Sequence, residues 1–351
     1  MERAKACRKN VYLYGGGVHK QYVVSFLQKH GVEISAILDS FCQGNYEGIP
    51  ILLYDDFLLS NWDSESLFFI SSPTAEQEIR EVLEKHIPKE HIFCSETAPY
   101  VDWITDVEGY RAYLVEHWDE LSRMYDALAD ERSKETFVNL IKGRISGRTN
   151  YFREVYAPDK YYPADILRLS KGEVWVEIGA YRGETLLDFL KLCPDYQAAY
   201  CFEPDKYNLR SLNETVARVQ KDGKIRVIPK AAYDVQTELT FSEKTWASSR
   251  SHIVEEAGTN AGGVKTATID ETVDEPITYL KISTCCPELR ILRGGEQQIA
   301  KNHPKIAVCV SYCGEDLLDI WNYLRGLVPE YRFYLRHHLK NAGFETFLYA
   351  V

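Results

Sequence analysis

A short apolar run, Val174–Ile178, followed at once by a glycine turn is the feature that most constrains the fold of this chain. A run of this length with glycine after it is typical of a strand that is covered on both faces in a parallel sheet. Gly179 and Gly183 have no side chain, so the backbone can turn tightly there and come close to a ligand. A helix is expected next, and then a second strand that ends at Glu203. The pattern predicts an α/β fold with a ligand at the carboxyl ends of its strands.

The spacing of the glycines narrows the class of ligand. The turn has neither the G-x-G-x-x-G spacing of dinucleotide-binding domains nor the lysine of a phosphate-binding loop. Glu203 is expected at the tip of the neighbouring strand, where its carboxylate can accept hydrogen bonds from both hydroxyls of a ribose. The sequence therefore favours a nucleoside ligand, and S-adenosylmethionine fits better than a dinucleotide or a nucleoside triphosphate.

Length, charge and cysteine content exclude several classes of protein. A chain of 351 residues is too long for one ordinary core, so two domains are expected. The formal net charge of −11 argues against sequence-independent binding of nucleic acid. No apolar run approaches membrane-spanning length, and the basic start leads into a glycine turn, so we expect a soluble, cytoplasmic protein. Nine scattered cysteines indicate reduced thiols rather than a disulfide framework.

The pattern of apolar residues divides the chain into three stretches. Residues 1–98 alternate short strands with amphipathic helices, which predicts a small doubly wound α/β domain of the nucleotide-binding type. Residues 99–160 are rich in Tyr, Leu, Glu and Arg without strand-like alternation. We interpret them as a helical connector that offers a surface for a homodimer. Residues 161–351 alternate strand and helix again and contain the glycine turn at Gly179.

A second glycine turn, Gly15-Gly16-Gly17, lies in the first stretch and allows two interpretations. Lys20 stands where a dinucleotide fingerprint has its third glycine, and Asp39 follows where a ribose-binding acid would lie. A nucleotide or nucleotide-sugar could bind at the start of the following helix. Alternatively, the glycines only allow the strand-to-helix turn. We favour the second interpretation, because two glycines are a weak signal.

Five segments follow one another in the last 190 residues or so: Val176–Thr185, Phe202–Asp205, Ala247–Arg250, Val264–Asp270 and Phe333–His338. Their order resembles that of FkbM-type methyltransferases. These are S-adenosylmethionine-dependent enzymes that commonly O-methylate sugars or other hydroxylated small molecules. The resemblance implies a Rossmann-like domain with a mixed seven-stranded sheet. It also implies that Glu203 binds the ribose of the cofactor, and that the methionine end is lined by Glu177, Gly179, Tyr181 and Gly183.

The chain departs from this family at the ends of two predicted strands. After Tyr279–Ile282 the family normally has Asp-x-Glu-Gly-Ala-Glu, whereas this chain reads Ser-Thr-Cys-Cys-Pro-Glu over residues 283–288. After Ile306–Ser311 the family usually has Tyr-His, and this chain has Tyr312 and Cys313. Two acids and a histidine have thus become a serine and two cysteines, with one more cysteine beside them. Both changes fall where an open parallel sheet places its chemistry.

The three thiols Cys285, Cys286 and Cys313 suggest a soft-metal site. As thiolates they suit zinc, Cu(I) or an iron–sulfur cluster, and they bind hard cations poorly. Cys309 is not expected to be a fourth ligand, because four residues along a strand span roughly 13 Å. Three protein ligands would leave one position open for the substrate or the cofactor.

Two alternatives to a metal site remain open. The cysteines are either small apolar filler in an ordinary O-methyltransferase that uses other residues, or part of a non-catalytic scaffold that keeps the fold. Glu288, the acid that survives in the altered motif, is a candidate base, although it also favours the start of a helix. Tyr312 is expected to cap the pocket of a small polar substrate, and Arg250 to close over the cofactor or hold an anionic group. His337 and His338 are expected to be structural.

Overall fold

The chain folds into two compact units of unequal length. The computed structural model describes residues 10–15, 20–60, 63–72, 76–94, 107–146, 149–220, 223–242, 252–254, 262–284, 287–340 and 342–351. The first unit comprises Met1–Tyr113, Val138–Tyr156 and Leu339–Gly343, and the second comprises Leu114–Phe137, Ala157–His338 and Phe344–Val351. The division at residues 98 and 160 that the sequence suggests stays a prediction.

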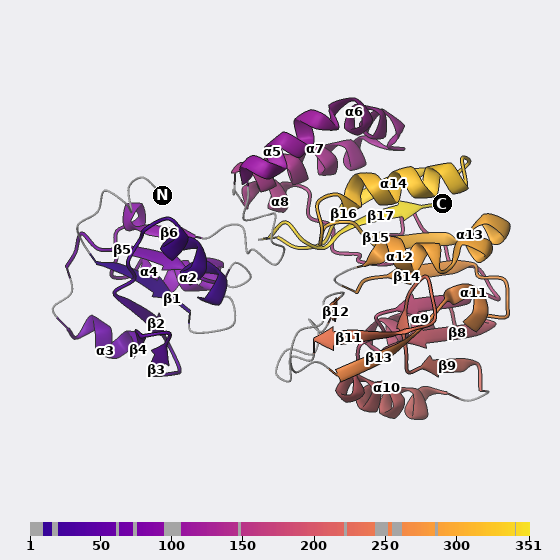
Figure 1. Cartoon of the computed structure of the whole chain (residues 1–351), viewed down its shortest axis with the longest axis horizontal. Coiled ribbons are helices and arrows are strands. Elements are labelled where there is room, and N and C mark those ends of the chain that lie inside the picture. Colours follow the sequence, from indigo (N-terminus) through magenta and orange to yellow (C-terminus); the bar gives the residue numbers. More distant parts are fainter. Residues whose placement is uncertain are drawn as a thin grey trace. The chain divides into compact units, whose positions relative to one another are not determined.

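The first unit contains the predicted doubly wound sheet (Figure 1). Its strand order is β3-β4-β2-β1-β5-β6, and every neighbouring pair is parallel except β3 with β4. Buried apolar side chains form one core on each face of this sheet, which explains why its central strand is buried along its whole length. The strands are β1 (Val11–Tyr14), β2 (Ala36–Asp39), β3 (Gly44–Tyr46), β4 (Ile49–Leu53), β5 (Leu67–Ile70) and β6 (Ile92–Cys94), and the helices are α2 (Lys20–Lys29), α3 (Tyr54–Leu58) and α4 (Glu76–Leu83).

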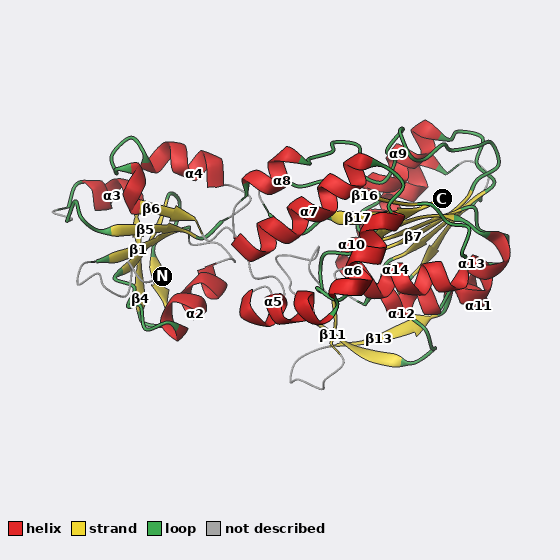
Figure 2. Cartoon of the chain, turned by 90° about the horizontal axis from the view of Figure 1, so that it is seen from above, coloured by secondary structure: helices red, strands yellow, loops and turns green. Residues whose placement is uncertain are grey.

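The stretch 99–160, which was expected to be helical, contains helices between residues 107 and 154 (Figure 2), and its residues 99–106 lie outside the described residues. Helix α6 is amphipathic and buries Leu121 and Met124, which supply the apolar face that a surface helix needs. Within the second unit α6 packs beside the later helix α14 (Asp316–Leu327). The helices of this stretch are α5 (Val107–Glu116), α6 (Trp118–Ala127), α7 (Glu131–Ser146) and α8 (Asn150–Glu154).

The second unit is built on the predicted mixed sheet of seven strands. Their order is β16-β17-β15-β14-β7-β8-β9, and only β17 runs antiparallel to its neighbours. Five of these strands are buried at every residue, as expected for a sheet with helices on both faces. The strands are β7 (Val174–Ile178), β8 (Ala198–Phe202), β9 (Ile225–Ile228), β14 (Tyr279–Ile282), β15 (Lys305–Cys309), β16 (Phe333–His337) and β17 (Thr346–Ala350).

Helices cover both faces of this sheet, and a small second sheet lies beside it (Figure 1). Asp205 caps helix α10, because its carboxylate accepts hydrogen bonds from the backbone N–H groups of Tyr207 and Asn208. The helices, besides α14, are α9 (Glu184–Leu192), α10 (Lys206–Val219), α11 (Ile269–Thr272), α12 (Glu288–Arg293) and α13 (Glu296–Asn302). The four-stranded sheet has the order β10-β13-β11-β12, from β10 (Ala231–Ala232), β11 (Glu238–Ser242), β12 (His252–Val254) and β13 (Gly262–Ala267).

The register of the parallel strands brings their carboxyl ends to one edge. Ile178 at the end of β7 lies opposite Phe202 in β8 and Ile282 in β14, and Ile282 lies opposite Val308 in β15. The loops that follow these strands therefore meet at one place, where open α/β sheets bind their ligands. None of the described helices is long and apolar enough to cross a membrane.

Candidate functional site

The glycine turn after β7 is as tight as the sequence predicts. Gly179 has a φ of +79° and Gly183 a φ of +91°, a region that favours glycine. A Cβ atom on Gly179 would lie 2.4 Å from the carbonyl oxygen of Ser283, so the turn also packs directly against the backbone after β14. Gly183 is the N-cap residue of α9. At Gly179 the turn therefore combines a positive φ with a backbone contact that leaves no space for a side chain.

Glu203 lies at the tip of β8, as predicted, and holds the glycine turn. Its Oε2 accepts a hydrogen bond from the Tyr181 N–H at 2.8 Å, and its Oε1 accepts one from the Asp205 N–H at 2.9 Å. The side chain is 6% exposed, and this burial raises the pKa of Glu203 to about 7, although the hydrogen bonds oppose the shift. Tyr181 is held at a φ of +51°, which a residue other than glycine rarely adopts. The carboxylate of Glu203 thus links the end of β8 to the glycine turn that follows the neighbouring strand, β7.

Glu177 forms a buried ion pair with Lys281, a residue that the sequence reasoning missed. The two lie opposite each other in β7 and β14, and Lys281 Nζ is 3.0 Å from Glu177 Oε1. The same ammonium group donates to the carbonyl oxygen of Gly179 at 3.1 Å. Burial raises the pKa of Glu177, and Lys281 opposes that shift. A lysine within an otherwise apolar strand, next to a strand that contains an acid, is a signal from which this pair could have been predicted.

Tyr161 also reaches this edge, from the loop before β7, and was likewise not predicted. Its ring centroid is 4.7 Å from Lys281 Nζ and 4.6 Å from Lys160 Nζ. Burial raises the pKa of Tyr161 to about 12, while Lys281 and a hydrogen bond with the Ser283 side chain oppose the shift. Its φ of +69° is strained for a tyrosine, and such strain persists where the surroundings fix a residue firmly. Tyr161 therefore belongs to the wall of the site beside Ser283.

The altered motif after β14 is described only in part. Cys285 and Cys286 lie outside the described residues, and so does Arg250. Glu288 is fully buried at the first position of α12, where its Oε1 accepts hydrogen bonds from the N–H of Thr284 at 3.0 Å and from its Oγ1 at 3.3 Å. Glu288, the acid retained in this motif, thus binds Thr284 at the start of the segment that joins β14 to α12.

The thiol and the tyrosine after β15 lie at the same edge of the sheet. Cys313 is half-buried, and its N–H donates to Asp316 Oδ2 at 2.8 Å. Tyr312 is half-buried and packs against the core. Cys309 is fully buried within the sheet, with its Sγ 3.4 Å from Ser311 Oγ. Within the described ranges, no three His, Cys, Asp or Glu side chains are placed to hold a metal ion, so the three-cysteine site stays a prediction.

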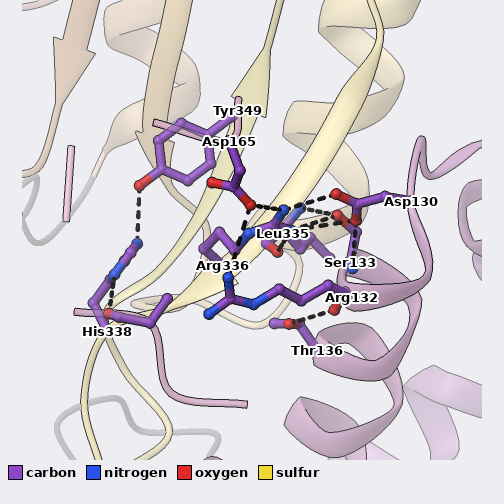
Figure 3. Close-up of polar contacts among 10 residues, drawn as sticks. Asp130, Arg132, Ser133, Thr136, Asp165, Leu335, Arg336, His338 and Tyr349 are labelled. Carbon is purple, nitrogen blue, oxygen red and sulfur yellow. Dashed lines mark hydrogen bonds and ion pairs between the residues drawn. The ribbon is translucent and has the colours of Figure 1, made fainter. Parts of the chain in front are cut away.

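The polar residues of β16 and the segment after it face the protein interior, as expected for structural residues. Figure 3 shows Arg336 between Asp130 and Asp165, with Nη2 2.7 Å and 2.6 Å from their Oδ2 atoms. His338 Nδ1 lies 2.7 Å from the carbonyl oxygen of Ala157, and burial lowers the pKa of His338 to about 4. His337 Nδ1 lies 2.8 Å from Thr346 Oγ1 within the sheet. These side chains therefore hold the sheet to its surroundings.

The glycine turn of the first unit has a different environment. Asp39 at the end of β2 accepts hydrogen bonds from the N–H groups of Phe41 at 2.8 Å and Cys42 at 3.1 Å. A Cβ atom on Gly15 would lie 2.5 Å from Ser71 Oγ, which itself donates to the carbonyl oxygen of Gly15. Residues 16–19 of this turn lie outside the described residues. Asp39 therefore stabilises the turn that follows β2 through these hydrogen bonds.

Comparison with known proteins agrees with the motif pattern. Residues 177–344 match the model of the methyltransferase FkbM domain family. The fold is similar to that of the methyltransferase FkbM from Methylobacillus flagellatus KT, with 22% identity, a TM-score of 0.78, and coverage of 98% of this chain and 91% of that chain. No curated protein matches the sequence.

Other solved structures match over a smaller part of the chain. An rRNA methylase from Streptococcus thermophilus has 12% identity and a TM-score of 0.34, covering 57% of this chain and 91% of that chain. The fibrillarin of Aeropyrum pernix, solved with natively bound S-adenosyl-L-methionine, has 14% identity and a TM-score of 0.34, covering 53% of this chain and 69% of that chain. The resemblance predicted from the sequence is confirmed by the family match: residues 177–344 form a methyltransferase FkbM domain.

Proposed function

We propose that this domain binds S-adenosylmethionine at the carboxyl edge of its seven-stranded sheet and transfers the methyl group to a small polar molecule. The observation that carries the proposal is the position of Glu203. A carboxylate at the tip of β8 is hydrogen-bonded to the glycine turn after β7. This is the arrangement in which an acid accepts hydrogen bonds from the hydroxyls of a ribose while the turn faces the rest of the nucleoside.

Other features of the turn fit the same cofactor. Gly179 and Gly183 have positive φ values that favour glycine, so the backbone keeps the tight turn against which we propose the cofactor lies. Glu177 has one oxygen paired with Lys281, while its Oε2 accepts no hydrogen bond from the described residues. A buried acceptor of this kind suits the ammonium group of a methionine moiety. When bound, S-adenosylmethionine supplies a methyl group activated by the adjacent sulfonium.

On the acceptor side we propose Glu288, Tyr312 and Arg250 as the residues that contact the substrate. Tyr161 joins this set, because its hydroxyl reaches Ser283 at the same edge. Glu288 is the least direct candidate for a base, since Thr284 already donates two hydrogen bonds to it. We propose that the hydroxyls of Tyr161 and Tyr312 orient an acceptor hydroxyl instead.

Calorimetric titration with S-adenosylmethionine and S-adenosylhomocysteine tests the cofactor proposal. We expect the full chain to bind both, and Glu203→Ala to weaken binding by about tenfold or more, the value of a charge-assisted hydrogen bond. Asp39→Asn is the matched control, because Asp39 is also a strand-end acid after a glycine turn, but in the first unit. It is expected to leave the affinity unchanged. A wild-type chain that binds neither ligand would overturn the proposal.

A thiolate metal site is a second proposal at the same edge, supported by the half-buried position of Cys313 in the loop that follows β15. Purification without oxygen, followed by measurement of metal content and visible absorption, tests it. A colourless, metal-free protein whose cofactor affinity is unchanged in Cys313→Ser would rule it out. A protein that binds the cofactor but methylates no sugar or other hydroxylated acceptor would favour the non-catalytic scaffold. The homodimer and the cytoplasmic location remain predictions.

A further inference from the structure

Lys281 makes three contacts at the point where the cofactor's methionine end is proposed to lie. Its ammonium group is 3.0 Å from Glu177 Oε1, 3.1 Å from the carbonyl oxygen of Gly179, and 4.7 Å from the ring centroid of Tyr161. The Lys281 side chain is 2% exposed and that of Glu177 is 0% exposed. Lysine is seldom buried without a partner, because removing an ammonium group from water is costly. These contacts fix both the charge and the position of the group.

Glu177 is left with one oxygen that has no partner. Its Oε2 is buried and accepts no hydrogen bond from the described residues, although Thr185 lies close enough to lower the pKa of Glu177. A buried carboxylate oxygen without a donor is uncommon in a native protein and calls for an explanation. A ligand with an N–H group at this position would supply the missing donor.

We propose that Lys281 is a positioning residue for cofactor binding. It holds one oxygen of Glu177 and the carbonyl of Gly179, and thereby directs the other oxygen of Glu177 toward the ammonium group of the cofactor's methionine part. This inference rests on the proposed function. It adds Lys281 as a residue that acts on the cofactor through Glu177 and does not itself contact it. Without Lys281, Glu177 would be an unpaired buried carboxylate and would take up a proton instead of staying charged.

Several other ionisable groups act on this pair. The negative charge of Glu184 at the start of α9 disfavours the charged form of Glu177. The positive charge of Lys160 likewise disfavours the charged form of Lys281. The remaining neighbours are neutral hydroxyls and a thiol, whose pKa values are raised first by burial. Lys281 is thus the cation that balances Glu177 among the groups that act on it. These neighbours are Tyr161, Tyr162, Tyr279 and Cys201.

The test compares two ligands that differ only in the amino group. S-Adenosylhomocysteine and its analogue with hydrogen in place of that amino group are titrated into the full chain by calorimetry. In the wild type we expect the amino group to improve affinity by about tenfold or more. In Lys281→Met this ratio should fall to about one, since Glu177 is then protonated. A purely structural role for Lys281 would weaken both ligands equally and leave the ratio unchanged, which would overturn the inference.

A second ion pair in the same domain supplies the control. Lys305 pairs with Glu173, which is 1% exposed, at the amino ends of β15 and β7. Lys305→Met therefore removes the cationic partner of another buried carboxylate, at the amino ends of the strands rather than at their carboxyl ends. We expect it to lower stability while the amino-group ratio stays at its wild-type value. A ratio lost equally in both variants would count against a specific role for Lys281.

The outcomes separate this inference from the proposed function. If the wild type does not bind S-adenosylhomocysteine, the proposed function fails and the inference fails with it. If the wild type binds but Lys281→Met keeps the wild-type ratio, only the inference fails. Should Lys281→Met not fold, Lys281→Gln replaces it, because glutamine keeps a donor for the Gly179 carbonyl but has no charge. We expect the ratio to fall in that variant as well.

Discussion

At the residue scale, two glycines separate the effect of backbone strain from that of close packing. Gly172 and Gly179 have φ values of +78° and +79°. A Cβ atom on Gly172 would meet nothing within 4 Å, whereas one on Gly179 would lie 2.4 Å from the Ser283 carbonyl oxygen. We expect Gly172→Ala to cost about 1 kcal/mol from strain alone. Gly179→Ala should cost a further ~1–3 kcal/mol from overpacking and should also weaken cofactor binding.

Urea unfolding of the wild type and the two alanine variants checks this prediction. Gly172→Ala serves as the control, because it changes the same residue type at the same φ in the same unit. Equal losses of unfolding free energy in the two variants would show that the contact with Ser283 contributes nothing to the requirement for glycine at position 179.

Glu203 predicts a pH dependence of stability with a definite sign. Burial raises its pKa to about 7 in the folded chain, above its ordinary value, so the native state binds the proton more tightly than the unfolded state. Stability is therefore expected to fall as pH rises from about 4.5 to 7, by up to ~3 kcal/mol in total. Glu203→Gln removes this dependence. The free energy of unfolding of the variant, minus that of the wild type, should therefore be larger at pH 8 than at pH 5.

Chemical unfolding at pH 5 and pH 8 measures this gain. The matched control is Glu214→Gln on α10, since Glu214 is exposed and pairs with Arg210 at the surface. It should show no comparable gain. A wild-type stability that changes no more than that of Glu203→Gln over this range would contradict the prediction. A buried acid that lowers stability at neutral pH is expected at a binding site, because functional sites are where proteins depart from the arrangements that favour stability.

Part of the site could be predicted from the sequence, and the rest could not. The turn at Gly179 and Gly183 and the strand-end position of Glu203 follow from local patterns, because each depends on a strand and the residues directly after it. Tyr161 could not be predicted in this way, since its place depends on a strained φ and on contacts with Lys160 and Lys281. Such contacts arise only when the loop before β7 packs against the folded sheet.

At the element scale, Arg336 links β16 to α7 and to the loop before β7. Its guanidinium contacts Asp130, Asp165 and the hydroxyl of Ser133 while the side chain is 1% exposed. Burial alone would raise the pKa of Asp130, but its hydrogen bonds with Arg336 and Ser133 lower it overall. Arg336→Met should therefore lower the free energy of unfolding by about 2–4 kcal/mol, because removing one partner of a buried pair is costly but both acids are partly exposed.

Thermal and urea unfolding of Arg336→Met check this loss. The control is Arg332→Met, because Arg332 precedes the same strand but is exposed and lies over the ring of Tyr334. We expect the gap between wild type and Arg336→Met to narrow at acid pH, as Asp130 becomes protonated in both. A loss no larger than that of Arg332→Met would show that this cluster does not hold the elements together.

The larger elements were predictable and the smaller sheet was not. The strands of the seven-stranded sheet are continuous apolar runs, which few other structures favour. The four-stranded sheet was missed, since its strands are short or polar and β13 begins with two glycines that weaken any strand signal. Long-range pairing between β11 and β13 forms these strands despite their composition.

At the scale of the whole molecule, the chain moves between its two units several times. Residues 114–137 belong to the second unit although they lie in the stretch that was interpreted as a connector. Residues 339–343 belong to the first unit although strands of the second unit precede and follow them. Composition indicates two α/β sheets and a helical stretch between them. It cannot assign these short segments, because membership of a unit depends on tertiary contacts rather than on local pattern.

The position of β17 has a consequence for how the protein forms during synthesis. This strand, Thr346–Ala350, lies between β15 and β16 and is antiparallel to both. Until these residues leave the ribosome, β15 presents an open edge of hydrogen-bonding groups and β16 has no strand to join. Until then the partly synthesised sheet exposes a strand edge, a state prone to aggregation. The seven-stranded sheet therefore closes only after its six other strands have been synthesised.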